Sequence, residues 1–390
     1  MITFIHSADW QLGKPFAGVE DIAKRSRIQQ ERIEAIRRIR EVVRNRQARF
    51  VLVAGDLFDS PTPTKTVVAQ ALGMIGEIPV PVYVIPGNHD HGGHGSLWEQ
   101  PFFLSEQRTR ASNLEVILDR RPILRDDVVI LPCPLRRRQE TTDPAAWIRD
   151  IDLNEFGDRP RIVLAHGSVG TFGSQADSEE VAGPPNLIGL DALPLADIDY
   201  CALGDWHGFT QAGPKAWYSG THETDRFPKG GQRPGQVACV AVSRGGIPVV
   251  EAIPTGQLSW LEASLALGDD GPAACEEAIA ALTRDAGFDR CLVDLGLTGR
   301  VSLAARRDLD RVLESWSHRL LRLDVHDDLS IVPSPDEIRE LTERADDPIL
   351  SGVARELARR IEAGAADAED AREAVNILHE LCIRAGEGSR

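Results

Sequence analysis

Acidic, amide and imidazole side chains follow five separate apolar runs in the N-terminal part of the chain. These positions are Asp9 and Gln11, Asp56 and Asp59, Asn88 and His89, His166, and Asp205 and His207. Such groups are poor choices for strand interiors but good ligands for hard or borderline divalent cations. One isolated Asp after a strand is more often a turn or cap residue, but five such clusters predict a single shared metal site.

The apolar runs that carry these residues have the pattern of strands buried on both faces. Helical patterns lie between the first of them, at 24–49, where apolar residues recur at helical spacing, and near 64–76. Sheets of such strands are covered by helices, and ligands gather beyond the carboxyl ends of the strands. We therefore predict an α/β fold that brings the five clusters to one place.

The composition is that of a soluble globular chain with more than one domain, with 390 residues and 42% hydrophobic content. The net charge of −16 argues against a surface that binds nucleic acid everywhere, but not against a local basic track. The segment 24–49 is such a track, and it is either a solvated helix face or a phosphate-contacting face.

The sequence gives no indication of a membrane protein, because no apolar run approaches the roughly 20 residues of a spanning helix. The N-terminus MITFIHSAD lacks the basic start and long apolar core of a signal peptide. The six cysteines are scattered, without a CxxC pair. We expect reduced thiols in a cytoplasmic protein that does not associate with membranes.

In order and spacing, the motifs resemble those of the calcineurin-like metallophosphoesterase superfamily. The opening IHSADWQLGKPF and the later YSGTHE at 218–223 are similar to its SbcD-type DNA-repair nuclease branch. The resemblance covers residues 1–225 in detail and only the architecture afterwards. It implies a four-layer α-β-β-α sandwich, followed by a small α+β capping domain and C-terminal helices that bind a partner.

Changes of pattern divide the chain into three regions. A predicted hairpin, turning at Gly245 and Gly246, completes the first. Helical patterns near 273–286 and 303–317 then alternate with apolar runs, and the segment IVPSPDE is read as a linker to further helices. The predicted regions are a metallophosphoesterase nuclease domain at 1–257, an α+β capping domain at 258–332 and a helical partner-binding region at 333–390.

Carried over position by position, the resemblance implies two divalent metal ions. Their ligands would be Asp9, Gln11, Asp56 and His207 for the first, and Asp56, Asn88, His166 and Asp205 for the second. The shared Asp56 would bridge them, because a carboxylate has two oxygens and offsets the repulsion of cations about 4 Å apart. A hydroxide between the metals would attack phosphorus in line, while His89 stabilises charge and protonates the leaving oxygen. Asp59 would orient His89, or else act as a turn or cap residue.

The family usually has His where this chain has Gln11 and Asp205. A Gln amide oxygen is a weaker, neutral ligand, whereas an Asp oxygen is harder and adds a negative charge. Both changes move the site from nitrogen toward oxygen ligation, which favours manganese or magnesium over zinc or copper. We predict an active, manganese-preferring site whose first metal is held loosely, with Gln11 acting through water.

Five further residues are candidates for substrate binding, and each has a structural alternative. His91 lies in the Gly-rich segment HDHGGHGS, which is either a substrate contact or a mobile loop. Arg136, Arg137 and Arg138 form a basic cluster that would meet a DNA backbone or remain a solvated loop. His222 would line the cleft or close a turn.

The sequence contains no Gly-x-x-x-x-Gly-Lys-Ser/Thr motif, so any ATP hydrolysis requires a partner. The resemblance implies that this partner is an SMC-like coiled-coil ATPase of the SbcC kind. The amphipathic segments 349–363 and 368–384 are candidate docking helices, unless they pack against their own chain. A homodimer is compatible with the resemblance, although no segment specifies one.

The leading interpretation is a metal-dependent DNA phosphodiesterase, an exo- or endonuclease of DNA repair. A phosphodiesterase or phosphatase for small molecules would suit the acidic charge, and steep salt dependence would distinguish DNA binding from it. The third interpretation is a non-catalytic subunit that clamps DNA or regulates an ATPase. In that case Asp56→Ala or His89→Ala would leave function intact.

Overall fold

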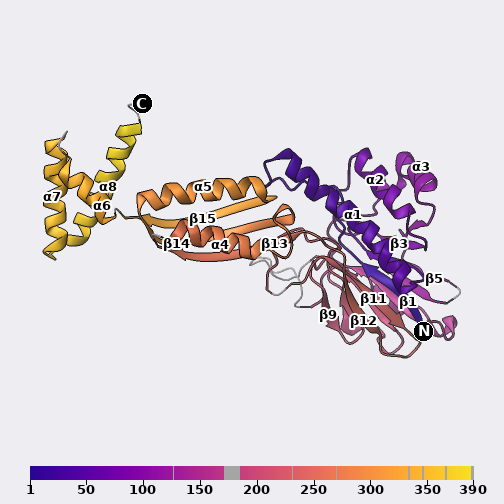
Figure 1. Cartoon of the computed structure of the whole chain (residues 1–390). Helices are drawn as coiled ribbons and strands as arrows, with labels where there is room; N and C mark the ends of the chain where they lie inside the picture. The colour runs from indigo at the N-terminus through magenta and orange to yellow at the C-terminus, as the bar shows by residue number, and fades with distance from the viewer. Residues whose placement is uncertain are drawn as a thin grey trace. The chain divides into compact units, whose positions relative to one another are not determined.

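The computed structural model describes residues 1–125, 127–170, 185–230, 232–268, 270–332, 334–344, 347–364 and 367–387. Within them the chain divides into two units, Met1–Trp260 and Leu261–Arg390. Figure 1 labels many of the helices and strands of both units. The three predicted regions stay predictions, and Pro333, where the third was expected to begin, lies outside the described residues.

The first sheet of the N-terminal unit has the strand order β12-β11-β1-β2-β3-β4, in which β1 to β4 run parallel. β11 and β12 form the predicted antiparallel hairpin. β11 also pairs antiparallel with β1, so the hairpin extends the sheet beyond its first strand. The strands are β1 (Ile2–Ser7), β2 (Val51–Ala54), β3 (Val82–Ile85), β4 (Leu114–Val116), β11 (Gln236–Val242) and β12 (Val249–Pro254).

The second sheet has the order β5-β6-β7-β8-β10-β9. Its central strands β6, β7, β8 and β10 are parallel, and the outer strands β5 and β9 are antiparallel to their neighbours. The strands are β5 (Ile123–Leu124), β6 (Val129–Cys133), β7 (Arg161–His166), β8 (Tyr200–Gly204), β9 (Thr210–Gly213) and β10 (Ala216–Tyr218).

The two sheets share an apolar layer, in which Phe4 and Leu52 of the first sheet pack with Ile162 and Leu164 of the second. Helices cover the outer face of the first sheet, and short 3₁₀ helices cover the outer face of the second. The covering elements are α1 (Ile22–Arg46), α2 (Lys65–Gly76), η1 (Leu97–Glu99), α3 (Pro101–Arg110), η2 (Ala146–Asp150), η3 (Leu153–Phe156) and η4 (Leu190–Ala192). The predicted metallophosphoesterase sandwich is confirmed.

The helix α1 begins at a residue with a strong capping side chain. Asp21 accepts hydrogen bonds from the backbone N–H groups of Ala23 and Lys24, at 2.8 and 3.1 Å. At its other end, Gln47 takes a left-handed φ of 52° and closes the last turn. Between these caps the helix starts two residues earlier and ends three residues earlier than the predicted 24–49 segment.

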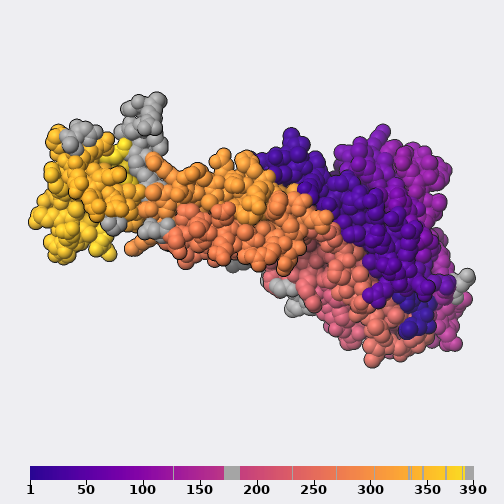
Figure 2. All heavy atoms as spheres, in the orientation of Figure 1, coloured from indigo at the N-terminus to yellow at the C-terminus, as the bar shows by residue number. Residues whose placement is uncertain are grey.

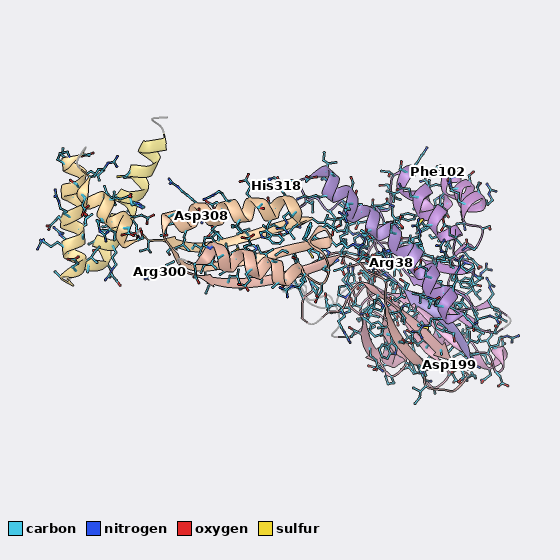
Figure 3. The ribbon with its side chains drawn as sticks, in the orientation of Figure 1. Arg38, Phe102, Asp199, Arg300, Asp308 and His318 are labelled. Atoms are coloured by element: carbon cyan, nitrogen blue, oxygen red, sulfur yellow. The ribbon has the colours of Figure 1, made fainter. Side chains whose placement is uncertain are left out.

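The arginines of α1 do not all lie on a solvated or phosphate-contacting face, which were the two expectations for this segment. The helix lies on the surface of its unit (Figure 2), yet Arg32 is only 1% exposed. Other arginines are neutralised by carboxylates, as Arg38, labelled in Figure 3, is by Glu223 at 2.9 Å. The prediction was wrong for Arg32 because the carbonyls that bury it come from distant parts of the chain.

The C-terminal unit contains a three-stranded sheet in the order β13-β14-β15, with β14 and β15 parallel. Leu295, Leu297 and Leu309 belong to its apolar core. Its elements are β13 (Ser259–Leu267), α4 (Gly271–Thr283), η5 (Phe288–Arg290), β14 (Cys291–Val301), α5 (Leu303–Arg319), β15 (Arg322–Ile331), α6 (Pro335–Glu343), α7 (Pro348–Glu362) and α8 (Ala368–Glu387).

The helix α6 was not expected, because IVPSPDE was interpreted as a linker. Ser334 Oγ accepts from the Glu337 backbone N–H at 3.2 Å, and Glu337 Oε2 accepts from the Ser334 N–H at 2.7 Å. This reciprocal capping box, with a proline in the first turn, is a helix start. None of the described helices is long and apolar enough to cross a membrane.

Candidate metal centre

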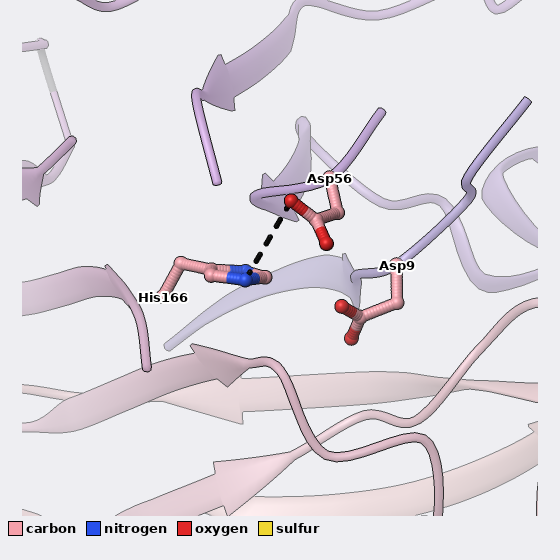
Figure 4. Close-up of side chains that lie close together, drawn as sticks. All are labelled: Asp9, Asp56 and His166. Carbon is pink, nitrogen blue, oxygen red and sulfur yellow. Dashed lines mark ion pairs between the residues drawn. The ribbon is translucent and has the colours of Figure 1, made fainter. Parts of the chain in front are cut away.

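The carboxyl ends of strands from both sheets bring three ligand-bearing side chains together. Asp9 follows β1, Asp56 follows β2 and His166 ends β7, and one ligand atom of each lies within 4.8 Å of the others (Figure 4). Backbone hydrogen bonds hold the two acidic loops side by side, from Asp9 N to Gly55 O at 3.1 Å and from Gln11 N to Asp56 O at 2.8 Å. The predicted convergence of strand ends is therefore present for these residues.

Several of the candidate ligands stand in left-handed backbone that non-glycine residues rarely adopt. The φ angles are 53° at Asp9, 41° at Gln11, 53° at Asp56 and 101° at Asp205. Such conformations cost of order 1–3 kcal/mol each and cluster at functional sites. They turn each side chain away from the strand direction and toward the space between the sheets' ends.

Asn88, His166 and Asp205 form one flank of the centre, which we call the Asn88 side. His166 Nδ1 donates to Ala54 O at 2.8 Å, so its Nε2 lone pair faces the cluster. From Nε2 the distances are 3.0 Å to Asn88 Oδ1, 3.7 Å to Asp56 Oδ1 and 3.8 Å to Asp205 Oδ1. Octahedral ligands at about 2.1 Å from a cation are separated by roughly 3.0 to 4.2 Å. The Asn88 side therefore fits a divalent cation.

The Asn88 amide supports this fit. With its nitrogen turned inward, the amide donates to Asp56 at 3.0 and 3.2 Å and to His166 Nε2 at 3.0 Å. With its oxygen turned inward, the amide presents an acceptor 3.0 Å from His166 Nε2. An inward oxygen is the atom through which an Asn side chain ligates a hard cation.

Because the carboxylates are buried, a bound cation would stabilise their charged forms. Burial raises the pKa of Asp9 to about 6, although the imidazoles of His207 and His166 oppose the change. Burial lowers the pKa of His166, but the carboxylates of Asp56, Asp9 and Asp205 outweigh it and raise that pKa to about 9. The buried carboxylates thus favour positive charge beside them, either a proton on the His166 ring or a divalent ion that would replace that proton.

Gln11, Lys14, His207 and Asp225 form the opposite flank, which we call the Gln11 side. Gln11 Nε2 lies 3.4 Å from His207 Nε2, and Gln11 Oε1 accepts from Lys14 Nζ at 3.0 Å. His207 Nδ1 donates to the buried carboxylate of Asp225 at 3.1 Å, so the lone pair of the imidazole lies on Nε2. The sequence indicated neither Lys14 nor Asp225.

His89 lies at the edge of the cluster, with a side chain that is 33% exposed. Its backbone N–H donates to Asp56 Oδ1 at 2.9 Å, and its Nε2 lies 3.9 Å from Asp56 Oδ2. Its Nδ1 donates to the backbone carbonyl of Asp59 at 2.8 Å, whereas the Asp59 carboxylate is 4.0 Å away. The hydrogen bond between Asp59 and His89 therefore runs through the main-chain carbonyl of Asp59, and the predicted orienting role stays a prediction.

Asp90, next to His89, joins two loops of the site. Its carboxylate accepts from the backbone N–H groups of Gly87 at 2.8 Å and Phe58 at 3.0 Å. Burial, followed by the nearby Asp56 carboxylate, raises its pKa to about 7. Gly87 is required here because a Cβ at that position would lie 2.1 Å from Asp56 Oδ1.

The five candidate substrate contacts do not share one environment. His91 is half-buried, and Arg136, Arg137 and Arg138 are exposed. Their two loops adjoin, since Gly92 N donates to Leu135 O at 2.8 Å.

His222 is a correction. It is 0% exposed, stacks on Trp10 at 5.2 Å between ring centroids and lies 2.7 Å from Arg32 O through Nε2. A fully buried imidazole offers no surface to a substrate, so the predicted substrate contact fails.

Arg32, buried beneath the Gln11 side, is a supporting residue that the sequence did not reveal. Its guanidinium donates to Trp10 O at 2.6 Å, to Glu223 O at 3.0 Å and to Asp9 O at 3.2 Å. Through these bonds Arg32 links the left-handed loop that contains Asp9 with the segment that contains Glu223 and Asp225. A helical arginine could have been recognised as buried only from its place among the apolar residues Ile28, Ile33 and Ile36.

Comparison with known proteins identifies the family of this chain. A solved crystal structure is similar at a TM-score of 0.36 and 12% identity, over 64% of this chain and 98% of that one, which is too distant to support a conclusion. An uncharacterized metallophosphoesterase, YhaO of Bacillus subtilis (strain 168), is 33% identical over 106 residues, and the match spans 26% of each chain. The model of the calcineurin-like phosphoesterases matches residues 2–209, more than half of the chain. This chain belongs to the calcineurin-like phosphoesterase family.

Proposed function

We propose that this chain is a metal-dependent phosphodiesterase acting on DNA, of the SbcD-type repair nuclease branch. The observation that carries the proposal is the convergence of Asp56, Asn88, His166 and Asp205 beside the partly exposed His89. A donor set rich in oxygen favours Mn²⁺, with Mg²⁺ as the alternative. The ligand sets are those implied by the resemblance, with Asp56 shared between two ions.

Divalent ions held by these ligands would polarise the phosphate ester and supply hydroxide at neutral pH. The protein's part is to hold the ligands and to place a proton donor. The Asp59 carbonyl keeps a proton on His89 Nδ1, so a second proton on Nε2 faces the ligand cluster and can pass to the leaving oxygen. Partial exposure of His89 lets a large substrate reach it.

DNA is the proposed substrate because exposed cations adjoin the centre. Arg136, Arg137 and Arg138 lie on the loop that packs against the Gly92 segment, close in sequence to His89. Arg226, half exposed, contacts His207. A phosphate backbone is recognised by such cations. The arginines of α1 give weaker support, because carboxylates such as Glu77 and Glu251 already pair with them.

An SMC-like coiled-coil ATPase of the SbcC kind is the proposed partner. Apolar side chains remain exposed on the last two helices, with Ile349 81% and Val353 46% exposed on α7, and Ile377 51% and Leu381 56% exposed on α8. Exposed apolar faces of amphipathic helices favour docking into a partner's groove. Ile349→Asp with Leu381→Asp should abolish co-elution with the purified ATPase while hydrolysis persists. A homodimer is the alternative occupant of this face.

A nuclease assay on DNA with defined ends tests the proposal. We expect cleavage with Mn²⁺, none with EDTA, and a steep fall in DNA binding as salt rises. Labels on the 5′ and 3′ ends would then separate exo- from endonuclease action. Hydrolysis of bis(p-nitrophenyl) phosphate without cleavage of any DNA would instead favour a small-molecule phosphodiesterase, and cleavage that survives chelation would contradict the metal mechanism.

A further inference from the structure

Lys14 joins two groups of the Gln11 side. Its ammonium donates to Gln11 Oε1 at 3.0 Å and forms a close ion pair with Asp225. The Lys14 side chain is 21% exposed and that of Asp225 is 0% exposed, so water screens the pair weakly. The carbonyl oxygen is the one atom of a Gln side chain that can ligate a hard cation. In this arrangement it is already occupied by a protein cation.

A second cation strengthens the effect. Arg226 Nη2 lies 2.8 Å from His207 Nδ1 and 3.3 Å from His207 Nε2. The imidazole nitrogen that would ligate the first metal therefore faces a guanidinium, and Gln11 presents its amide N–H group toward the same imidazole at 3.4 Å. A divalent ion entering here meets Lys14 and Arg226, whose two positive charges the single carboxylate of Asp225 offsets only in part, and the remaining Coulomb repulsion opposes it.

The Asn88 side has no equivalent arrangement among the hydrogen bonds of the described residues. His166 Nδ1 donates to the neutral Ala54 carbonyl, and Asp205 accepts from the hydroxyl of Ser168 at 3.1 Å. Its ligand atoms are held by neutral groups and remain free to turn toward an ion. The two flanks thus differ in the charge of the groups that hold their ligands.

We propose that Lys14 withholds the Gln11 carbonyl from the first metal position, so that the chain binds one divalent cation tightly on the Asn88 side and a second one weakly. The inference rests on the proposed metal-dependent function and specifies how its metal occupancy is set. Lys14 acts through Gln11 and Asp225 and is a positioning residue.

Titration of the metal-free chain with Mn²⁺ tests this, by calorimetry for affinity and by electron paramagnetic resonance for ion pairing. We expect one tight site and a second at least tenfold weaker, with an uncoupled Mn²⁺ spectrum at one equivalent. Lys14→Met should tighten the second site about tenfold and leave the first unchanged, and Gln11→His should also tighten it. Lys65→Met, which removes an exposed charge on α2, is the matched control and should change neither site.

Two equal sites in the unaltered chain would overturn the inference, as would a second site that Lys14→Met leaves unchanged. If Lys14→Met does not fold, Lys14→Gln can replace it, because it keeps a hydrogen-bond donor without the charge. The titration of the unaltered chain still tests whether the two Mn²⁺ sites are unequal. Failure of the proposed function is distinguishable, because it would appear as the expected asymmetric binding without hydrolysis. Hydrolysis with two equal sites would refute the inference alone.

Discussion

The Asn88 side and the Gln11 side of the centre offer comparable ligand types but hold them differently. On the Asn88 side, a backbone carbonyl orients His166, and oxygen atoms of Asn88, Asp56 and Asp205 lie 3.0–3.8 Å from its Nε2. On the Gln11 side, Lys14 occupies the amide oxygen and a buried carboxylate, Asp225, orients His207. Metal affinity should therefore depend on more than the identity of the ligands. The groups that hydrogen-bond to the ligand side chains also carry charge, and this charge differs between the two sides.

Removing Asp56, the carboxylate that we propose both sides share, should have the largest effect. Asp56→Ala takes a ligand from each side, and we expect hydrolysis to fall by roughly 10⁴-fold, or about 5 kcal/mol in the barrier. Both Mn²⁺ sites should weaken together in the calorimetric titration. Asp119→Ala, an exposed carboxylate, is the control and should change neither. Loss of one site alone would show that Asp56 does not bridge.

His89 belongs to neither side as a ligand, so its removal should separate chemistry from binding. His89→Ala should lower turnover by about 10³-fold through loss of the proton donor, with metal content unchanged. His94→Ala, a fully exposed imidazole a few residues away, is the matched control. Metal loss in His89→Ala, measured by elemental analysis, would mean that the residue is a ligand.

His6 connects the strands that carry the two sides, and it should make the fold sensitive to acid. It lies within hydrogen-bond distance of Tyr200 Oη at 2.9 Å and Leu203 O at 3.1 Å on β8. Burial lowers its pKa from 6.5 to about 3, although the Leu203 carbonyl opposes this, so the folded state binds the proton less readily than the unfolded one. Its contribution to stability is complete above pH 6.5 and is lost as the pH falls toward 3.

Between pH 6.5 and pH 4 this loss should amount to about 3 kcal/mol, measured by urea unfolding in EDTA. His6→Gln should flatten the dependence. The raised pKa values of the buried Asp9 and Asp90 act with the opposite sign, because protonation stabilises the folded state at these residues. Subtracting the stability curve of His6→Gln from that of the unaltered chain removes their contribution. Parallel curves for the two proteins would exclude His6 as the source.

The smallest effect should come from the carboxylate behind His207. Asp225→Asn removes the charge that offsets Lys14 and Arg226, and we expect Mn²⁺ affinity on the Gln11 side to fall about 10–100-fold. The Asn88 side should keep its affinity. Asp59→Asn is the control, because Asp59 contributes through its carbonyl. Equal weakening of both sides would remove the distinction between them.

The sequence predicted the strands, the main helices and the strand-end clusters because each has a local signal. Asp9, Asp56 and His166 each end an unbroken apolar run, and parallel strands deliver their carboxyl ends to one place. Helix α6 was missed although Ser334 and Glu337 have the spacing of a capping box, because the prolines around them indicated a linker.

The supporting contacts could not be predicted, for physical reasons. A backbone carbonyl such as that of Asp59 or Ala54 has no sequence signature, yet each fixes a histidine. Asp225 lies in a loop 18 residues after His207, and only folding brings the two together. Arg32 shares the helical spacing of Ile28 and Ile36, but the distant carbonyls that accept from its guanidinium have no local signal.

The left-handed backbone at Asp9, Gln11, Asp56 and Asp205 has an evolutionary consequence. Glycine would relax each of these positions, so substitutions that destroy hydrolysis could at the same time raise the melting temperature. Laboratory selection for heat resistance alone would then favour replacement of these residues by glycine. Selection for turnover would have to keep them in their strained backbone conformation. Related proteins that have lost hydrolytic activity should therefore carry glycine at some of these four positions.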